Sequence, residues 1–158
     1  SFEADIRLED VVAAVFGRAA AAAREKGLHP SFNVIESAPA RGNADILERL
    51  AANLLENAVR YTPPGGRIEV TVDRSETGAG RIIVADSGIG IPKESIPGIF
   101  DRFTVVDASR SKETGGAGLG SSIVKRVADI HGAASEVRSR IGEGARFIVR
   151  FPPVDPLK

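Results

Sequence analysis

The sequence lacks cysteine, methionine and tryptophan, and it contains a single tyrosine. The absence of cysteine excludes disulfides, cysteine nucleophiles and metal sites built on thiolates. Neither sign of charge prevails, because 21 lysine and arginine residues balance 21 aspartate and glutamate residues. No apolar run approaches the roughly 20 residues that span a bilayer. We therefore expect this domain to contact neither nucleic acid nor a membrane.

The first residues, SFEADIRLED, lack the basic and then apolar layout of a signal peptide. They also lack an initiator methionine, so we interpret the chain as a fragment of a longer protein. Its 158 residues are 42% hydrophobic and 27% charged. This length and composition predict a single domain, residues 1–158, with a substantial hydrophobic core.

Hydrophobic periodicity predicts three helices and five strands. The expected helices cover residues 8–25, 43–61 and 119–131. The expected strands cover residues 29–35, 67–73, 81–87, 134–140 and 145–151. Between them, SAPARGN (37–43) is expected to form a loop. This order predicts an α+β fold, a two-layer α/β sandwich with a mixed, mainly antiparallel sheet and three long helices on one face.

Residues 87–118 contain several glycines and show no sustained periodicity, although one or two short helices are expected near residues 93–103. A segment of roughly 30 residues is too long to be an idle connection in a compact domain. We expect it to be functional or disordered.

The second predicted helix carries a polar stripe in the sequence LERLAANLLENAVRYT. At about 100° per residue, Asn53, Glu56 and Arg60 lie away from the leucines, whereas Asn57 and Tyr61 lie nearer the border. Asparagine is a poor helix former, yet two of them point to one side. Amide oxygens beside a carboxylate and an arginine suit a hard cation and its phosphates. A solvated helix face explains the same stripe, and both interpretations stay open here.

The stretch VADSGIGIP (84–92) places Asp86 at the end of a buried strand, just before Gly88 and Gly90. Glycines allow a ligand to approach the backbone closely. A carboxylate in such a pocket accepts a hydrogen bond from an exocyclic amino group, as in adenine, and disfavours a carbonyl, as in guanine. A β-turn capped by Asp86 is the alternative.

A third glycine-rich stretch, GGAGLGSS (115–122), precedes the last predicted helix. Exposed amides at a helix N-terminus bind phosphate well. The stretch lacks the Gly-Lys-Ser/Thr ending of a Walker loop, and Ser121 stands where the dinucleotide fingerprint needs glycine or alanine. A simple glycine linker is the alternative. By itself, GEGARF (142–147) predicts only a hairpin turn.

Taken together and in order, these segments resemble the motifs of the ATP-binding catalytic domain of bacterial sensor histidine kinases. The wider superfamily includes gyrase, heat-shock chaperones and mismatch-repair ATPases. NLLENAVRYTPPGG resembles the N box, DSGIGIP the first glycine box and IFDRF the F box. GGAGLGSSIVKRVADIHG and GEGARF resemble the second and third glycine boxes. The resemblance extends from about residue 7 to residue 151 and implies the Bergerat-type ATP-binding fold.

The resemblance implies that the ligands are ATP and Mg²⁺, and it implies roles for individual residues. Asn57 is expected to hold Mg²⁺, Asn53 to arrange the triphosphate, and Glu56 to take part in catalysis with Asn53. Further nucleotide contacts are expected from Arg60 to phosphate, Tyr61 to the adenine edge and Asp86 to the adenine amino group. The nucleotide-binding positions expected in the glycine boxes are Gly88, Gly90, Ile91, Gly116, Gly118, Leu119 and Gly120.

By the same resemblance, residues 103–118 are expected to form a lid over ATP that is hinged at its glycines. Arg102, Arg110 and Lys112 lie in or beside this lid and are candidates for phosphate contacts. Ala117, Ser121 and Ala145 depart from the residues common in the family.

The resemblance also implies partners. A histidine on a separate helical dimerisation domain of the same protein is expected to receive the phosphoryl group, for relay to a response regulator. Such a domain is expected to be cytoplasmic, at the cytosolic end of a membrane-anchored sensor kinase. His29 and His131 lack the context of a phosphoacceptor. We expect His29 on the surface of a strand and His131 at a helix C-terminus, where it favours the helix dipole.

Three other functions stay open at this point: a serine kinase of the anti-sigma type, an ATP-gated conformational module of the gyrase or chaperone class, and a nucleotide sensor without catalysis. The F box favours the histidine kinase over the serine kinase. The gyrase and chaperone class usually has a glutamate base four residues before the metal ligand, where this chain has Asn53.

Overall fold

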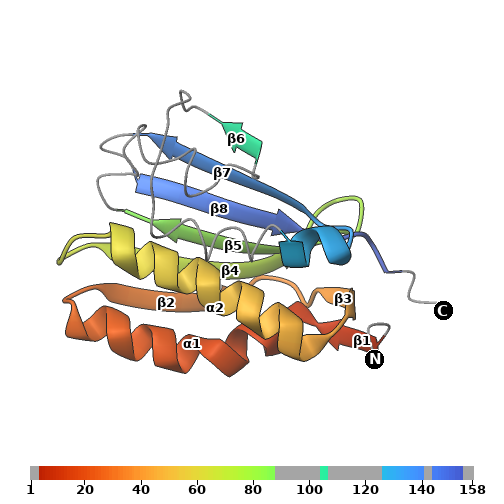
Figure 1. Ribbon diagram of the computed structural model, residues 1–158, viewed down its shortest axis with the longest axis horizontal. Coiled ribbons are helices and arrows are strands. Elements are labelled where there is room, and N and C mark those ends of the chain that lie inside the picture. The colour runs from red at the N-terminus through yellow and green to blue at the C-terminus, as the bar shows by residue number, and fades with distance from the viewer. Residues whose placement is uncertain (1–3, 88–103, 107–125, 141–143, 155–158) are drawn as a thin grey trace.

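The computed structural model describes residues 4–87, 104–106, 126–140 and 144–154 (Figure 1). The two helices are α1 (Leu8–Glu25) and α2 (Ala44–Tyr61), and residues 126–130 are also helical. The strands are β1 (Ala4–Arg7), β2 (His29–Val34), β3 (Pro39–Gly42), β4 (Arg67–Arg74), β5 (Gly80–Asp86), β6 (Thr104–Val106), β7 (Ala134–Arg140) and β8 (Gly144–Arg150). The five predicted strands agree with β2, β4, β5, β7 and β8 to within one residue at each end, whereas β1, β3 and β6 were not predicted.

The main sheet has six strands in the order β2-β4-β5-β8-β7-β6. The pairs β4–β5, β5–β8 and β7–β8 are antiparallel, whereas β2–β4 and β6–β7 are parallel. In the middle of the sheet, Val84 lies opposite Val70 on one side and Phe147 on the other. The predicted mixed and mainly antiparallel sheet is therefore confirmed.

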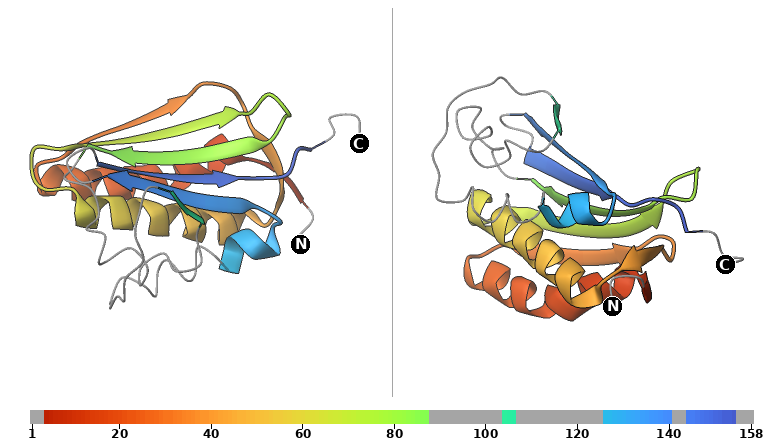
Figure 2. Two further views of the ribbon diagram at one scale, coloured as in Figure 1. Left: turned by 90° about the horizontal axis from the view of Figure 1, so that it is seen from above. Right: turned by 45° about the vertical axis from the view of Figure 1, so that its right-hand side comes forward.

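The helices cover one face of this sheet (Figure 2). α1 and α2 lie side by side in front of β2, β4 and β5, and the helical residues 126–130 lie on the same side near the start of β7. The two-layer sandwich is confirmed. Of the three long helices predicted, two are described in full, whereas only the last part of the third falls within the described residues.

The hydrophobic core lies between the helices and the sheet. The apolar stripe predicted for α2 is buried there, with Leu47, Leu50 and Leu54 fully inaccessible to solvent. β4 alternates as predicted, because Ile68, Val70 and Val72 are buried. The core also contains these side chains of α1, β5, β8 and the segment after it: Leu8, Val11, Val12, Ile82, Val84, Phe147, Val149 and Phe151.

The loop predicted for residues 37–43 is wrong, because residues 39–42 form β3, which pairs antiparallel with β1. Each of these strands has four residues, which is too short to show a period in the sequence. Ala38, just before β3, and Ala40 within it are buried in the hydrophobic core. The Leu8 amide donates to the Ala38 carbonyl oxygen at 2.8 Å, which holds the two segments together.

The ends of the helices follow from local chemistry. Asn43 precedes α2 as its N-cap, and its Oδ1 accepts a hydrogen bond from the Ile46 amide at 3.0 Å. Gly27 follows α1 with a φ of 87°, which favours glycine and ends the helix as predicted. Within the described part of the chain, no helix is both long enough and apolar enough to cross a lipid bilayer.

Candidate functional site

The last two turns of α2 carry the polar residues that the N-box resemblance singles out. Asn57 is only 4% exposed, whereas its neighbours Glu56 and Arg60 are exposed. Tyr61 is half-buried. A wholly solvated stripe is therefore wrong, because the Asn57 amide lies on the side of α2 that turns toward the sheet. Burying a polar amide is costly unless it has a partner, so its position indicates a specific role in structure or binding.

Asn53 lies one turn before Asn57 and is half-buried. Its Nδ2 donates a hydrogen bond to the carbonyl oxygen of Arg49 at 3.0 Å, within the same helix. This contact orients the amide group so that its nitrogen faces the preceding turn. Arg49 is exposed, which agrees with the solvated position predicted for it.

Asp86 ends β5 at one end of the main sheet, and it is 9% exposed. Its Oδ1 accepts a hydrogen bond from the Ala145 amide of β8 at 3.3 Å. This hydrogen bond satisfies one oxygen of the buried carboxylate and helps to fix its position. The described part of the chain therefore places a buried carboxylate at the predicted strand end.

Gly144 makes the surroundings of Asp86 possible. Its φ is 87°, and a Cβ on it would lie 2.0 Å from the backbone oxygen of Asp86. No side chain fits in that space, and the left-handed backbone also favours glycine. The third glycine box therefore does more than turn a hairpin, since its last glycine lets β8 approach the end of β5.

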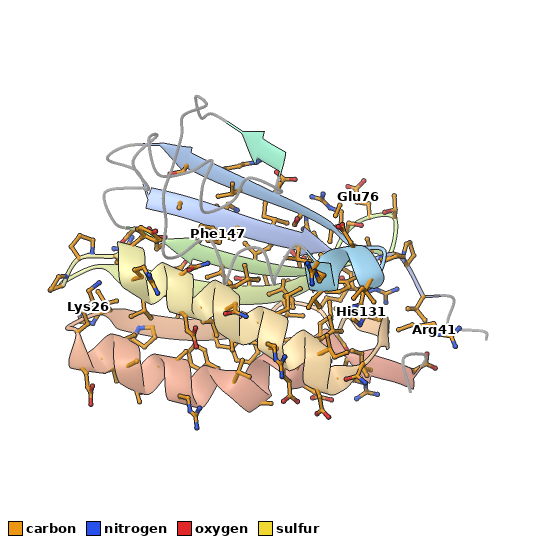
Figure 3. The ribbon with its side chains drawn as sticks, viewed as in Figure 1. Lys26, Arg41, Glu76, His131 and Phe147 are labelled. Atoms are coloured by element: carbon orange, nitrogen blue, oxygen red, sulfur yellow. The ribbon has the colours of Figure 1, made fainter. Side chains whose placement is uncertain are left out.

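The C-terminal end of α2 is held by residues that the sequence did not single out. The Lys26 Nζ donates to the carbonyl oxygens of Val59 at 2.7 Å and Arg60 at 3.1 Å. Figure 3 shows Lys26 at the end of the molecule where α2 finishes. Thr62 is fully buried, and its Oγ1 donates to the Ala58 carbonyl oxygen at 2.7 Å. A lysine after a helix is common, so its sequence position gave no signal that it reaches a second helix.

The neighbouring strand ends are tied together at the same end of the sheet. The Arg67 amide donates to the Ser87 hydroxyl at 2.8 Å, and the Ser87 amide donates to the Arg67 carbonyl oxygen at 3.0 Å. α2 packs against β5, which ends at Asp86. The structure thus brings the buried face of α2 and the Asp86 strand into adjacent layers.

Several predicted site residues lie outside the described residues, and their contacts stay predictions. These are Gly88, Gly90 and Ile91 of the first glycine box, and Gly116, Gly118, Leu119 and Gly120 of the second. The F box (99–103), Arg102, Arg110 and Lys112 also lie outside the described ranges. Of the predicted lid, only Thr104–Val106 is described, as strand β6.

A groove of about 460 Å³ runs between α1 and α2. Small apolar side chains such as Ala14, Ala22 and Ala52 line it, together with Arg18 and Glu56. Glu56 therefore borders this groove, whereas neither Asn57 nor Asp86 lines it. The predicted catalytic role of Glu56 stays a prediction.

A family model described as "Histidine kinase-, DNA gyrase B-, and HSP90-like ATPase" matches residues 42–155. The chain belongs to this family of ATPases. The match includes α2, β5 and β8, which carry Asn57, Asp86 and Gly144. Family membership accounts for the likeness of the described fold to the expected ATP-binding domain, and it implies nucleotide binding.

Among curated proteins, Sensor protein SrrB of Staphylococcus aureus (strain NCTC 8325 / PS 47) is 36% identical to the chain over 130 residues. The aligned region is 82% of this chain and 22% of SrrB. The SrrB sequence of strain COL gives the same values. The present chain therefore spans about a fifth of the length of these SrrB relatives.

Among solved structures, a mycobacterial sensor histidine kinase, MprB, has a TM-score of 0.74 and 26% identity, and the match covers 96% of this chain and all of that one. Full-length ShkA, solved in complex with AMPPNP, has a TM-score of 0.77 and 29% identity over 95% of this chain and 31% of ShkA. The nucleotide-free catalytic domain of the histidine kinase ThkA has a TM-score of 0.77 at 23% identity, over 96% of this chain and 97% of that domain, and this likeness shows the fold alone.

Proposed function

We propose that this chain is the catalytic domain of a sensor histidine kinase. It binds Mg-ATP and transfers the γ-phosphoryl group to a histidine on a separate helical dimerisation domain of the same protein, for relay to a response regulator. The observation that carries the proposal is the joint burial of Asn57 on α2 and Asp86 at the end of β5, which lie in adjacent layers. The sensor-kinase relatives and the AMPPNP complex of ShkA support it.

Asp86 selects the base. Its Oδ1 already accepts the Ala145 amide, and its second carboxylate oxygen is suited to accept the amino group of adenine. Guanine presents a carbonyl oxygen at that position, which would face a carboxylate oxygen without a proton between them. Tyr61, half-buried at the end of α2, supplies an aromatic edge for the base.

Asn57 provides an oxygen ligand of the kind that Mg²⁺ prefers, because an amide oxygen is a hard donor without charge, and Asn53 helps to arrange the triphosphate. Mg²⁺ would neutralise charge on the phosphate oxygens and hold them in place. The exposed Arg60 extends from the same helix and is suited to bind a phosphate group. These three side chains orient the triphosphate along the last turns of α2.

The transfer breaks the bond between the γ-phosphorus and its bridging oxygen, and it forms a bond from phosphorus to an imidazole nitrogen of the acceptor histidine. ADP is the leaving group. The exposed Glu56 is suited to interact with the incoming imidazole at the surface of the domain. The acceptor is expected to come from the partner domain, which completes the active site.

The proposal is tested with Asp86→Asn in calorimetric titrations with Mg-ATP and Mg-GTP. Asparagine keeps an oxygen for the Ala145 amide, but it replaces the second acceptor with a donor. Affinity for Mg-ATP should therefore fall about tenfold or more, as expected when a buried group loses its partner. The affinity for Mg-GTP should not fall below that of the unchanged chain.

Asp73→Asn is the matched control. Asp73 lies on the neighbouring strand β4 and forms an ion pair with Arg81 at 2.7 Å. Arg81 is near the start of β5, whereas Asp86 is at its end. Its substitution should leave nucleotide affinity unchanged. Equal affinity of the unchanged chain for both nucleotides would refute the role of Asp86.

A further inference from the structure

His131 is buried between two elements that the proposed site needs. Its imidazole is only 6% exposed, whereas Asp129 and Ile130 just before it are exposed. Figure 3 shows His131 where the helical segment 126–130 ends beside the start of α2. The predicted position at a helix C-terminus is confirmed, but the contacts of the ring are not those of a cation that interacts with the helix dipole.

The two ring nitrogens have opposite hydrogen-bonding roles. Nε2 lies 3.2 Å from the backbone nitrogen of Asn43, which can only donate. Nδ1 lies 2.9 Å from the carbonyl oxygen of Val127, which can only accept. Nε2 therefore accepts and Nδ1 donates, which requires the neutral ring with its proton on Nδ1.

Gly42 leaves the space that the ring occupies. A Cβ at this position would lie 2.1 Å from His131 Cδ2 and 2.4 Å from Nε2. The backbone of Gly42 does not have a positive φ, so glycine is needed here for the approach of the imidazole and not for the turn of the chain.

Asn43 connects the ring to the nucleotide site. Its backbone amide donates to His131, while its Oδ1 caps the first turn of α2 through the Ile46 amide. α2 is the helix that carries Asn53 and Asn57. Through its other ring nitrogen, His131 contacts Val127, in the helical segment that forms the last part of the second glycine box.

We propose that His131 is a positioning residue for the nucleotide site, which fixes the start of α2 against the end of the helical segment 126–130. It acts through Asn43 and Val127 and does not touch the nucleotide. This inference rests on the proposed function, because it takes Asn57 on α2 as part of the site.

The test compares His131→Gln with His131→Leu in the 158-residue chain. Glutamine keeps an oxygen acceptor within reach of the Asn43 amide, and leucine keeps apolar bulk without an acceptor. The leucine variant should bind Mg-ATP about tenfold more weakly, because the Asn43 amide at the start of α2 loses its acceptor. The glutamine variant should restore most of the affinity.

Gly42→Ala provides a second variant, because its methyl group displaces the ring without changing it. It should weaken Mg-ATP binding as His131→Leu does. Gly17→Ala is the matched control, since a Cβ on Gly17 of α1 meets no atom within 4 Å, and it should leave the affinity unchanged. Thermal unfolding of each variant separates loss of fold from loss of positioning.

Nitrogen-15 NMR of the imidazole in the unchanged chain, without nucleotide, tests the geometry directly. The expected spectrum shows a protonated Nδ1 and an unprotonated Nε2. A proton on Nε2, or equal affinities of the leucine variant and the unchanged chain, would overturn the inference and leave the proposed function intact. Failure of the unchanged chain to bind Mg-ATP would instead refute the proposed function, and the positioning role with it.

Discussion

Glu9, in the first turn of α1, holds the connection between β2 and β3. Its carboxylate accepts hydrogen bonds from the Ala38 amide at 3.0 Å and from the Ser37 hydroxyl. Burial by itself raises the pKa of Glu9, but the hydrogen bonds from Ala38 and Ser37 outweigh it, so the pKa lies below its ordinary value of 4.5. Folding therefore favours the charged carboxylate.

We expect Glu9→Gln to lower the free energy of unfolding at pH 7 by about 1 kcal/mol, after allowance for solvent screening of this partly exposed group. Because the folded-state pKa is lowered, this stabilisation is complete above the ordinary value and is lost as the pH falls through the lowered pKa. Chemical denaturation at pH 7 and at acid pH measures the difference between the two chains. The difference in stability should disappear at acid pH. A difference that does not change with pH would contradict the stabilising role of the charged Glu9 carboxylate.

Glu25→Gln serves as the control for that experiment, because Glu25 is an exposed glutamate at the other end of the same helix. It makes the same chemical change without the contacts to residues 37 and 38. Its stability at pH 7 should match that of the unchanged chain.

Single residues also show where prediction from sequence succeeds. The burial of Asp86 was predictable, because it ends a continuous apolar strand, although a β-turn capped by its carboxylate explained the same residues. The burial of Asn57 was harder to predict, because helical periodicity placed it at the border between two faces. The His131 contact with Asn43 joins residues 88 positions apart, and nothing local in the sequence encodes it.

At the scale of elements, the residue that follows α1 supports the C-terminal end of α2. The Lys26 ammonium contacts two carbonyl oxygens in the last turn of α2, where the helix dipole is negative. This contact holds the turn that carries Arg60 and Tyr61. A helix that belongs to no predicted motif thus stabilises the one that carries the N box.

We expect Lys26→Met to lower the free energy of unfolding by about 1 kcal/mol, because it removes a cation and its hydrogen bonds from a helix C-terminus. Methionine keeps most of the apolar length of the side chain. Thermal or chemical denaturation measures the loss, and Arg24→Met, an exposed cation in the last turn of α1, provides the comparison. Equal stability of the two variants would remove the capping role of Lys26.

Among the elements, long ones were predictable and short ones were not. α1, α2 and β4 each extend over enough residues for their period to be counted. β1 and β3 have four residues each, and their pairing is made by residues more than 30 positions apart in the sequence. The parallel pairing of β2 with β4 could not be predicted either, because the alternation within each strand is the same for a parallel and an antiparallel neighbour. Tertiary packing decides the direction.

At the scale of the whole molecule, the two histidines of the chain lie in different surroundings. His29 is exposed at the start of β2, on an edge strand of the main sheet. His131 is buried with both ring nitrogens engaged. The proposed function therefore needs an acceptor histidine from a partner domain.

We therefore expect the chain alone, incubated with Mg²⁺ and ATP labelled on the γ-phosphate, to form no stable phosphohistidine. Acid-labile, base-stable label on the isolated protein measures the product. His29→Asn distinguishes the exposed histidine from the buried one if label appears. Label at either position would contradict the need for a partner domain.

The pairing of β5 with β8 sets the order in which this domain can mature. The Asp86 carboxylate meets the Ala145 amide across 59 positions of sequence, whereas β4 and β5 are joined by a short turn. Contacts between distant parts of a chain form late, and a growing polypeptide emerges from its N-terminus. The Asp86 carboxylate therefore acquires its final surroundings only after β8 has left the ribosome, and a nascent chain that stops short of β8 has α1 and α2 but lacks the contact of Ala145 with Asp86.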